Sequence, residues 1–224
     1  MSQPRETSIF GELYSGYAAG RLEPGFALLV ETQAALRSDV AERVQVSEAI
    51  ASAMLEREAP AEMGADALDR AFAAIDQLDK GAAISQRAAT AAGAGIDEVM
   101  GLPEPLRDAV LHTMNHQSWQ FTTPGIRRLS LDLEGDAETE LYRLEPGVTV
   151  PRHTHAGSEF TLVVTGGFAD ELGAYGPGDL SVKGPEHTHQ PVADMDGICY
   201  ALAVRNGGLQ FTGLVGAMQR ILGV

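Results

Sequence analysis

The spacing of apolar side chains differs between the two halves of the chain. Through the first eighty residues, apolar positions recur every three or four residues, which is typical of amphipathic helices. The pattern predicts four helices, over residues 8–21, 24–36, 38–58 and 65–78. Pro24 suits the first turn of the second helix, and Ser38 or Asp39 is a candidate N-cap for the third. Four short amphipathic helices predict a small bundle.

The second half of the chain has a β pattern. Residues 103–116 are still helical in their periodicity, but from Trp119 polar and apolar residues alternate, as in half-buried antiparallel strands. The predicted strands cover residues 126–133, 138–144, 159–168, 180–182, 187–192 and 198–204, and a tail over 209–222 begins as a strand and ends as a helix. Many short strands with Gly and Pro turns predict a sandwich or small barrel.

A low-complexity stretch separates the two halves. Residues 81–95, GAAISQRAATAAGAG, consist mostly of small side chains, which is typical of a linker. We therefore predict an α+β chain with three parts: a helical bundle over residues 1–80, a linker over 81–102, and an all-β barrel domain over 103–224.

The candidate chemistry lies in the stretch Gly147–Gly166, GVTVPRHTHAGSEFTLVVTG. His153 and His155 are two residues apart, so both point to the same face of an extended strand. Glu159 follows at the start of an apolar strand. Two imidazoles and a carboxylate suit a borderline transition metal better than Mg²⁺ or Ca²⁺, which prefer oxygen ligands. A third histidine from a later strand is expected to complete the site.

Two histidines in GPEHTHQP, His187 and His189, are candidates for that third imidazole, and their shared parity lets either face the interior. The spacing Gly-x5-His-x-His-x3-Glu-x6-Gly is the first cupin motif, and this chain matches it at every position. The second motif is looser, with Gly176–Asp179 resembling its opening turn. The usual cupin spacing after that turn selects His189, with His187 as the alternate. The resemblance implies a jelly-roll barrel with a divalent metal on His153, His155, Glu159 and His189.

Other candidate residues have more ordinary interpretations. His112 and His116 are four apart, which would place both on one helix face, but no third ligand accompanies them in the sequence. We expect them to be ordinary helical histidines. The single cysteine, Cys199, lies in an apolar run, so we expect a small core residue and no internal disulfide.

Charge and hydropathy exclude several classes of function. The formal net charge of −15 argues against direct nucleic-acid binding, which needs a basic surface. Residues 1–80 hold seven Lys and Arg against fourteen Asp and Glu, a net −7 that fits a solvated helix face or a surface for a basic protein. No apolar run approaches the ~18–20 residues of a membrane span, and the polar N-terminus lacks a signal peptide. Together with the single cysteine, this predicts a cytoplasmic protein.

Several longer segments resemble one family. They are LYSGYAAGRLEPGFALLVETQAAL near the N-terminus and RHTHAGSEFTLVVTGGFADELGAYGPGDL, HQPVAD and FTGLVG in the second half. Over most of its length the chain resembles the ChrR-type anti-sigma factors. The resemblance implies that residues 1–80 hold an extracytoplasmic-function sigma factor inactive. It also implies that oxidative signals such as singlet oxygen release that factor, and that the cupin, with zinc on its four ligands, participates.

The chain departs from this family at one place. The family's helical domain carries a structural zinc on an N-terminal histidine and a His-x3-Cys-x2-Cys run, which aligns here with Gln33, Arg37 and Val40. Arginine has only hydrogen-bond donors and valine has no ligand atom, so we predict that this second zinc site is absent. Either apolar packing holds the bundle and it still binds a sigma factor, or the bundle now serves as a dimerisation or docking module.

Three functions remain open at this point. The first is a regulator whose cupin senses an oxidant or small molecule. The second is a metal-dependent cupin enzyme, of dioxygenase or isomerase type, with Tyr142, Glu140 or Tyr175 as candidates to move a proton. The third is a structural cupin that dimerises through strand edges. The resemblance implies zinc, while three histidines and a glutamate also suit Fe, Mn, Ni or Cu.

Overall fold

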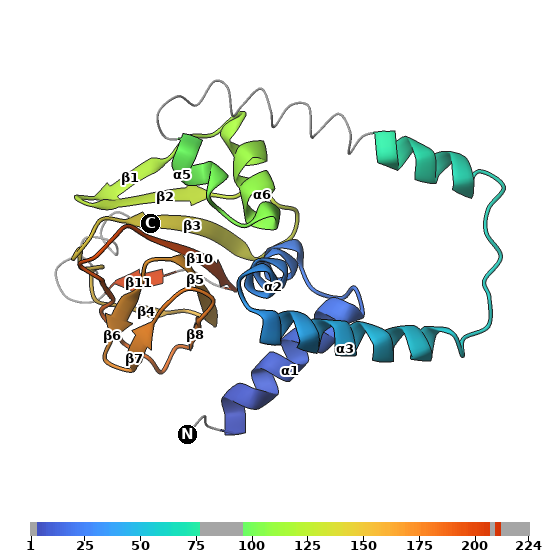
Figure 1. The fold of residues 1–224 in the computed structure, drawn as a ribbon, viewed down its shortest axis with the longest axis horizontal. Helices are drawn as coiled ribbons and strands as arrows, with labels where there is room; N and C mark the ends of the chain where they lie inside the picture. Colours follow the sequence, from blue (N-terminus) through green and yellow to red (C-terminus); the bar gives the residue numbers. More distant parts are fainter. Residues whose placement is uncertain (1–3, 77–95, 207–208, 212–224) are drawn as a thin grey trace.

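The computed structural model describes residues 4–76, 96–206 and 209–211 (Figure 1). The predicted linker over 81–95 and the predicted helix at the end of the tail lie outside these residues. Five helices carry labels: α1 (Pro4–Ala18), α2 (Pro24–Leu36), α3 (Ser38–Leu55), α5 (Ile96–Met100) and α6 (Glu104–Met114). Residues 67–76 are also helical. None of the described helices is both long and apolar enough to cross a membrane.

The start of α2 follows the prediction, whereas the start of α3 does not. Pro24 occupies the first turn of α2, where its missing N–H leaves no hydrogen bond unmade. Neither Ser38 nor Asp39 caps α3, because the N-cap is Arg37 and no side chain bonds a free backbone N–H there. The Asp39 carboxylate instead accepts a hydrogen bond from Arg37 Nε at 3.0 Å. The predicted cap was therefore wrong, since the guanidinium takes the carboxylate that a cap would use.

The second half of the chain forms the predicted antiparallel strands. The largest sheet has the order β1-β2-β3-β10-β5-β8. Its strands are β1 (Gln120–Thr123), β2 (Ile126–Ser130), β3 (Glu138–Leu144), β5 (Glu159–Thr165), β8 (Leu180–Lys183) and β10 (Cys199–Arg205). Two smaller sheets join β4 (His153–His155) to β11 (Leu209–Phe211), and β6 (Phe168–Asp170) to β7 (Gly173–Tyr175) and β9 (Val192–Ala193).

One predicted strand is much shorter than expected. Over residues 187–192 the chain makes isolated bridges between His189 and His153 and between Val192 and Thr149, and β9 begins at Val192. Pro185 precedes this segment and Pro191 lies within it, and proline has no N–H to donate to a ladder. Isolated bridges at His189 and Val192, and not a continuous strand, therefore hold this segment.

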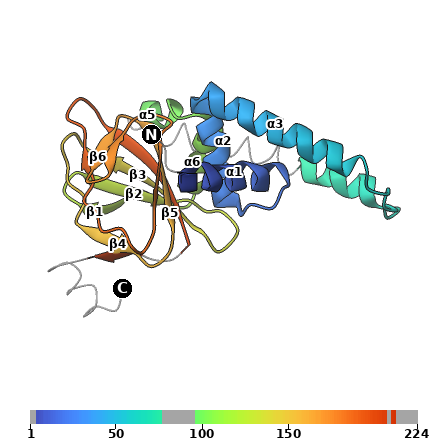
Figure 2. The same cartoon turned by 90° about the horizontal axis from the view of Figure 1, so that it is seen from below.

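The helices cover the outer face of the six-stranded sheet. All seven residues of β10 are buried, because that strand has a hydrophobic layer on both sides. Tyr200, Leu202 and Val204 belong to the cluster that contains the helical core, whereas Cys199 and Ala201 belong to the barrel interior. Figure 1 shows α2 beside the sheet and α5 and α6 over β1–β3, and Figure 2 shows α3 extending away from the barrel.

The contact between α2 and the sheet is close. A Cβ at Gly25 would lie 2.1 Å from Thr139 Oγ1 of β3, so the helix approaches the strand only because residue 25 lacks a side chain. One contact between the helix and the sheet is aromatic. The rings of Phe26 and of Phe160 on β5 pack edge to face, with their centroids 5.3 Å apart. Leu29 of α2 is fully buried in the same cluster. The helical layer and the outer face of the sheet thus share one hydrophobic core.

Hydrogen bonds join the same two layers at the far end of α2. Tyr14 donates to Gln33 Oε1 at 3.1 Å, and Gln33 Nε2 donates to the Gly178 carbonyl at 3.1 Å. Arg37 Nη1 lies 3.0 Å from Asp179 Oδ1. We call these five residues the interlayer link. It fastens the end of α2 to the turn that precedes β8.

Candidate metal centre

Four side chains converge inside the barrel. His153 and His155 come from β4, Glu159 begins β5, and His189 lies opposite His153 through the isolated bridge. All four are buried, and each offers a ligand atom within 4.8 Å of those of the other three. Among the residues that the structure describes, this is the one such group of three or more His, Cys, Asp or Glu. The structure therefore brings together the four residues predicted as ligands.

The hydrogen bonds around the cluster leave nitrogen lone pairs facing each other. His153 Nδ1 lies 2.8 Å from the Pro151 carbonyl and His189 Nδ1 lies 2.9 Å from Asp170 Oδ2, and both oxygens can only accept. In the neutral imidazoles the two Nε2 atoms, 3.1 Å apart, then both carry lone pairs. Such a pair repels unless a cation lies between the two nitrogens, so this geometry suits a metal ion.

Burial favours the neutral form of His153 and of His155. Desolvation lowers the pKa of His153 below its usual value and lowers the pKa of His155 to about 4. His155 Nδ1 is buried without a hydrogen-bond partner among the described residues. A neutral, unpaired imidazole nitrogen is a ready ligand for a divalent transition metal. The cluster could hold such an ion, and its three nitrogens and one carboxylate do not select one metal among Zn, Fe, Mn, Ni and Cu.

His187, the alternate candidate, lies outside the cluster. Its side chain is 34% exposed, and its Nδ1 accepts a hydrogen bond from the backbone N–H of Gly184 at 3.0 Å. His187 belongs to the turn before His189. No regular strand runs between the two histidines, so their shared parity does not place both side chains in the interior.

Sequence reasoning missed Asp170, which orients His189. Its side chain is fully buried, and Oδ2 lies 2.9 Å from His189 Nδ1 and 3.3 Å from Lys183 Nζ. The other oxygen, Oδ1, accepts backbone hydrogen bonds from Leu172 and Gly173. A carboxylate behind a ligating histidine fixes the ring tautomer and is a common feature of metal centres. Burial opposes ionisation of Asp170, but these hydrogen bonds and Lys183 hold its pKa below the usual value.

The three residues considered as proton-moving groups have structural partners. Tyr142 donates a 2.5 Å hydrogen bond to Glu140, and both contact Arg205. Arg205 also lies 3.3 Å from Glu159 Oε2, so this buried network touches the carboxylate end of the cluster. Tyr175 accepts a hydrogen bond from Lys183 at 2.9 Å. The network balances the charges that burial brings together.

Of the remaining candidates, His112 lies on α6, whereas His116 lies in the turn after that helix and not on it as predicted. His112 and His116 are exposed, and His116 Nε2 lies 2.9 Å from Asp132 Oδ2. Cys199 is fully buried and is therefore a core residue, as predicted. Desolvation raises the pKa of its thiol to about 12, so the thiol stays protonated.

Comparison with known proteins places this arrangement in a family. The profile of the ChrR Cupin-like domain matches residues 107–207. Anti-sigma-E factor ChrR of Cereibacter sphaeroides is 31% identical over 199 residues, which span 89% of each chain. The chain belongs to the ChrR family of anti-sigma factors. Among solved structures, ChrR from the Rhodobacter sphaeroides complex with SigE is 28% identical, with a TM-score of 0.66 over 88% of this chain and 96% of that one.

The resemblance implies a second zinc site in the helices of the relatives. At the aligned positions this ChrR-family chain has side chains that form hydrogen bonds or pack in the core. Gln33 and Arg37 both belong to the interlayer link, and Val40 is a buried core residue at 5% exposure. No cysteine and no histidine occurs among these positions. These side chains therefore do not fit a zinc ion. Two of them, Gln33 and Arg37, form polar contacts with the barrel instead.

Proposed function

We propose that this ChrR-family protein is a cytoplasmic anti-sigma factor whose helical half binds an extracytoplasmic-function sigma factor. The observation that carries the proposal is an extended apolar surface in the helical half that stays exposed among the described residues. The related ChrR of known structure is bound to SigE, which supports a partner of the same class here.

The exposed apolar surface has two parts, which we together call the docking face. Val46, Ile50 and Met54 follow one another at intervals of four on α3, and Leu68, Phe72 and Ile75 share one face of the helix over 67–76. These six side chains are between 52% and 66% exposed. An amphipathic helix needs a partner for its apolar stripe, and both stripes are exposed among the described residues. The docking face therefore favours a protein partner.

The two parts of the docking face lie on separate arms. In Figure 1 the distal half of α3 extends beyond α1 and α2, and the helix over 67–76 stands apart from it. Figure 2 shows both arms on the side away from the barrel. A ligand that covers both stripes must be of protein size, because no small molecule contacts both.

The test is the affinity of the full chain for the extracytoplasmic-function sigma factor of the same organism, measured by calorimetry. Phe72→Asp puts a charge on the apolar stripe and is expected to weaken binding at least thirtyfold, as for a central aromatic residue of an interface, ~2 kcal/mol or more. Ala73→Asp introduces the same charge about 100° around that helix from Phe72, off the apolar stripe, and is expected to change affinity less than threefold. Equal effects of the two variants, or no binding by the wild type, would contradict the proposal.

The cupin would then act as the sensor in a stress response, with zinc held by His153, His155, Glu159 and His189. When bound there, the metal would supply a Lewis-acidic centre. Support comes from the packing of α2 on β5 and β10, the strands that carry Glu159 and Arg205. A change at the cluster can therefore alter the surface on which the helices rest.

Metal removal tests the sensing role. The full chain is stripped with a chelator and reloaded with Zn²⁺, and its affinity for the sigma factor is compared in the two forms. The wild type is expected to bind differently when stripped, whereas His155→Ala is expected to bind equally with and without added Zn²⁺. Equal affinities for the loaded and stripped wild type would exclude the cluster as the sensor.

A further inference from the structure

A buried arginine lies behind the carboxylate of the metal cluster. Arg205 is the last residue of β10, and its Cα lies opposite that of Glu159 on β5 and that of Glu138 on β3. Side chains at opposite positions of neighbouring antiparallel strands point to the same face and lie close together. The register of these three strands therefore places a guanidinium against one of the candidate metal ligands.

The guanidinium of Arg205 is fixed by acceptors on several sides. Its Nη1 donates hydrogen bonds to Glu159 Oε2 and to the Tyr142 hydroxyl, both at 3.3 Å. Its Nε donates to Glu138 Oε2 at 2.8 Å, and its Nη2 donates to Glu140 Oε2. Because the guanidinium is rigid and planar, it cannot turn away from Glu159 without losing the other bonds. The positive charge is therefore held beside the cluster.

Both oxygens of the Glu159 carboxylate already accept hydrogen bonds. The Thr161 hydroxyl donates to Oε1 at 3.0 Å, and Arg205 donates to Oε2. Oε2 is also the oxygen that lies 3.8 Å from His155 Nδ1, so it is on the side of the imidazoles. A metal ion that bound this oxygen would share it with the guanidinium.

Arg205 compensates the charge of Glu159 more than that of the other carboxylates it touches. Glu140 has a second cationic partner, because Arg128 Nη1 lies 2.8 Å from its Oε1. The side chain of Glu138 is 53% exposed, so water screens its charge. The side chains of Arg205 and Glu159 are only 5% and 9% exposed, and charges at such depth interact strongly because little water lies between them.

We propose that Arg205 is a counter-charge that keeps the metal centre weak and exchangeable. The cluster offers a divalent ion three imidazoles, which bind metals in their neutral form, and one carboxylate whose charge is already balanced. The affinity of a site for a cation falls as the negative charge of its ligands falls. Such a site releases its ion more readily than one with an uncompensated carboxylate, which suits a sensor. The inference rests on the proposed metal centre.

The experiment measures the affinity of the full chain for Zn²⁺ by competition with a chromophoric chelator, and the rate at which excess chelator removes the ion. Arg205→Met removes the charge, and it is expected to bind Zn²⁺ at least tenfold more tightly, ~1.4 kcal/mol, and to release it more slowly. Arg205→Lys keeps the charge, and its affinity is expected to stay within threefold of the wild type. Damage to the fold would weaken binding, so a gain in affinity cannot come from a structural defect.

Arg128→Met is the matched control for the arginine. It removes the same charge from a side chain that is 40% exposed and that pairs with Glu140, with no ion pair to Glu159 in the described part of the chain. Its affinity for Zn²⁺ is expected to change less than threefold, because solvent screens its charge. Equal gains in Arg128→Met and Arg205→Met would mean that position beside Glu159 has no importance, and would overturn the proposal.

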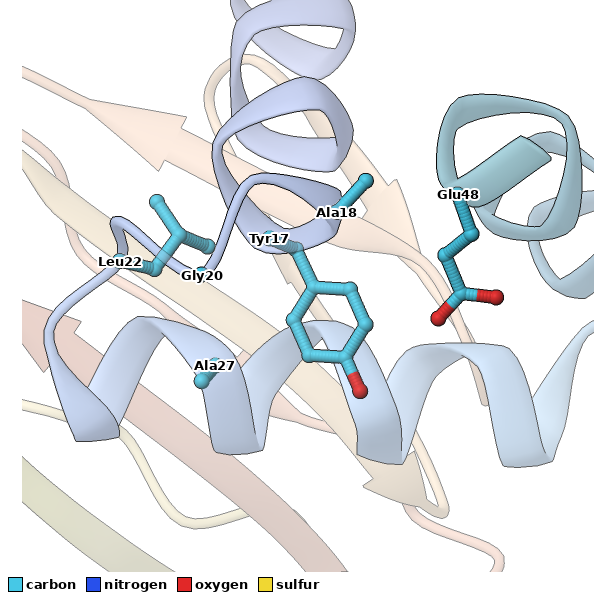
Figure 3. A pocket seen from close by; sticks show the side chains of 6 residues that line it. All are labelled: Tyr17, Ala18, Gly20, Leu22, Ala27 and Glu48. Atoms are coloured by element: carbon cyan, nitrogen blue, oxygen red, sulfur yellow. The ribbon is translucent and has the colours of Figure 1, made fainter. Parts of the chain in front are cut away.

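A second variant changes the charge balance in the opposite direction and leaves Arg205 in place. Glu140→Gln removes one carboxylate that shares the guanidinium, so more positive charge remains beside the cluster, and Zn²⁺ binding is expected to weaken at least threefold. Glu48→Gln is its control. Glu48 is on α3 and lines a pocket among the helices (Figure 3), so the variant removes the same charge outside the network and should leave the affinity unchanged.

The outcomes separate this inference from the proposed function. Unchanged or weaker Zn²⁺ binding by folded Arg205→Met would overturn the proposal, because the guanidinium would then orient Glu159 and not oppose the ion. If Arg205→Met does not fold, Glu140→Gln decides, and an affinity equal to that of the wild type overturns the proposal. If the wild type binds Zn²⁺ no better than His155→Ala, the proposed metal centre itself is wrong and this inference fails with it. None of these measurements involves the docking face.

Discussion

The Asp170→Asn substitution tests the metal centre most directly. Both oxygens of this buried carboxylate already accept hydrogen bonds, Oδ1 from two backbone N–H groups and Oδ2 from His189 and Lys183. The amide of asparagine has the same shape but one donor end. In one orientation its NH₂ faces the backbone donors, and in the other it faces the Lys183 ammonium and His189 Nδ1.

The second orientation has a chemical consequence for His189. An amide NH₂ beside Nδ1 requires a lone pair on that nitrogen, so the ring proton moves to Nε2, the atom that faces the cluster. A protonated Nε2 cannot bind a metal. Loss of a carboxylate that orients a ligating histidine typically lowers metal affinity ten- to a hundredfold, ~1.4–2.7 kcal/mol. We expect a decrease of that size for Asp170→Asn.

The assay is a competition titration of Zn²⁺ between the full chain and a chromophoric chelator. Asp170→Asn also leaves the Lys183 ammonium buried without its carboxylate, which can cost ~3–5 kcal/mol of stability. The double variant Asp170→Asn/Lys183→Met removes that ammonium and serves as the control. It should recover most of the stability but not the metal affinity. If folded Asp170→Asn binds Zn²⁺ within twofold of the wild type, the carboxylate does not orient His189 for a metal.

Three further predictions follow from the fold. His189→Ala should abolish Zn²⁺ binding measured by elemental analysis while His187→Ala retains it, and the reverse order would exchange their roles. In the metal-free protein, the unfolded chain protonates His155 near pH 6.5 but the folded chain only near pH 4. The free energy of unfolding should therefore fall by ~1.4 kcal/mol per pH unit as pH drops through that window. Urea titrations at a series of pH values measure this dependence. If the free energy of unfolding of His155→Gln depends on pH as steeply as that of the wild type, the reasoning is wrong. Gly25→Val should destabilise the protein by ~1–3 kcal/mol, because its Cβ would lie 2.1 Å from a threonine hydroxyl of β3, whereas Gly11→Ala has no neighbour within 4 Å and should be neutral or stabilising in thermal denaturation.

The convergence of the candidate ligand residues could be predicted because their geometry is local. His153 and His155 share a strand face by parity, and Glu159 begins the neighbouring stretch of barrel, so a single motif contains three of the four side chains. His189 needed a spacing rule from the cupin resemblance. Asp170 was missed because it comes from β6, and a carboxylate in the sequence FADE gives no sign that it will be buried behind a histidine nineteen residues later.

The packing of the helices was harder to predict. The second helix was predicted with its observed bounds, and its continuous run FALLV is typical of a helix buried on more than one side. Which surface it meets depends on Gly25, whose missing side chain has a structural role only once β3 lies beside it. The helix over 67–76 was also predicted, but its stripe of Leu68, Phe72 and Ile75 does not pack into a bundle. An amphipathic pattern shows that a helix has a partner without showing that the partner belongs to the same chain.

The interlayer link has a consequence for how such a protein can be divided. A zinc ion bound within the helices would cross-link them without any contribution from the barrel, and such helices could fold as a separate domain. Here Gln33 and Arg37 reach instead to Gly178 and Asp179 of the barrel, and Leu29 is buried in a core common to both layers. A fragment that ends at residue 80 would expose the apolar surface of α2 that the sheet normally covers, and we expect it to bind other proteins non-specifically. The helical half and the cupin therefore form one folding unit, and they must be engineered and assayed together.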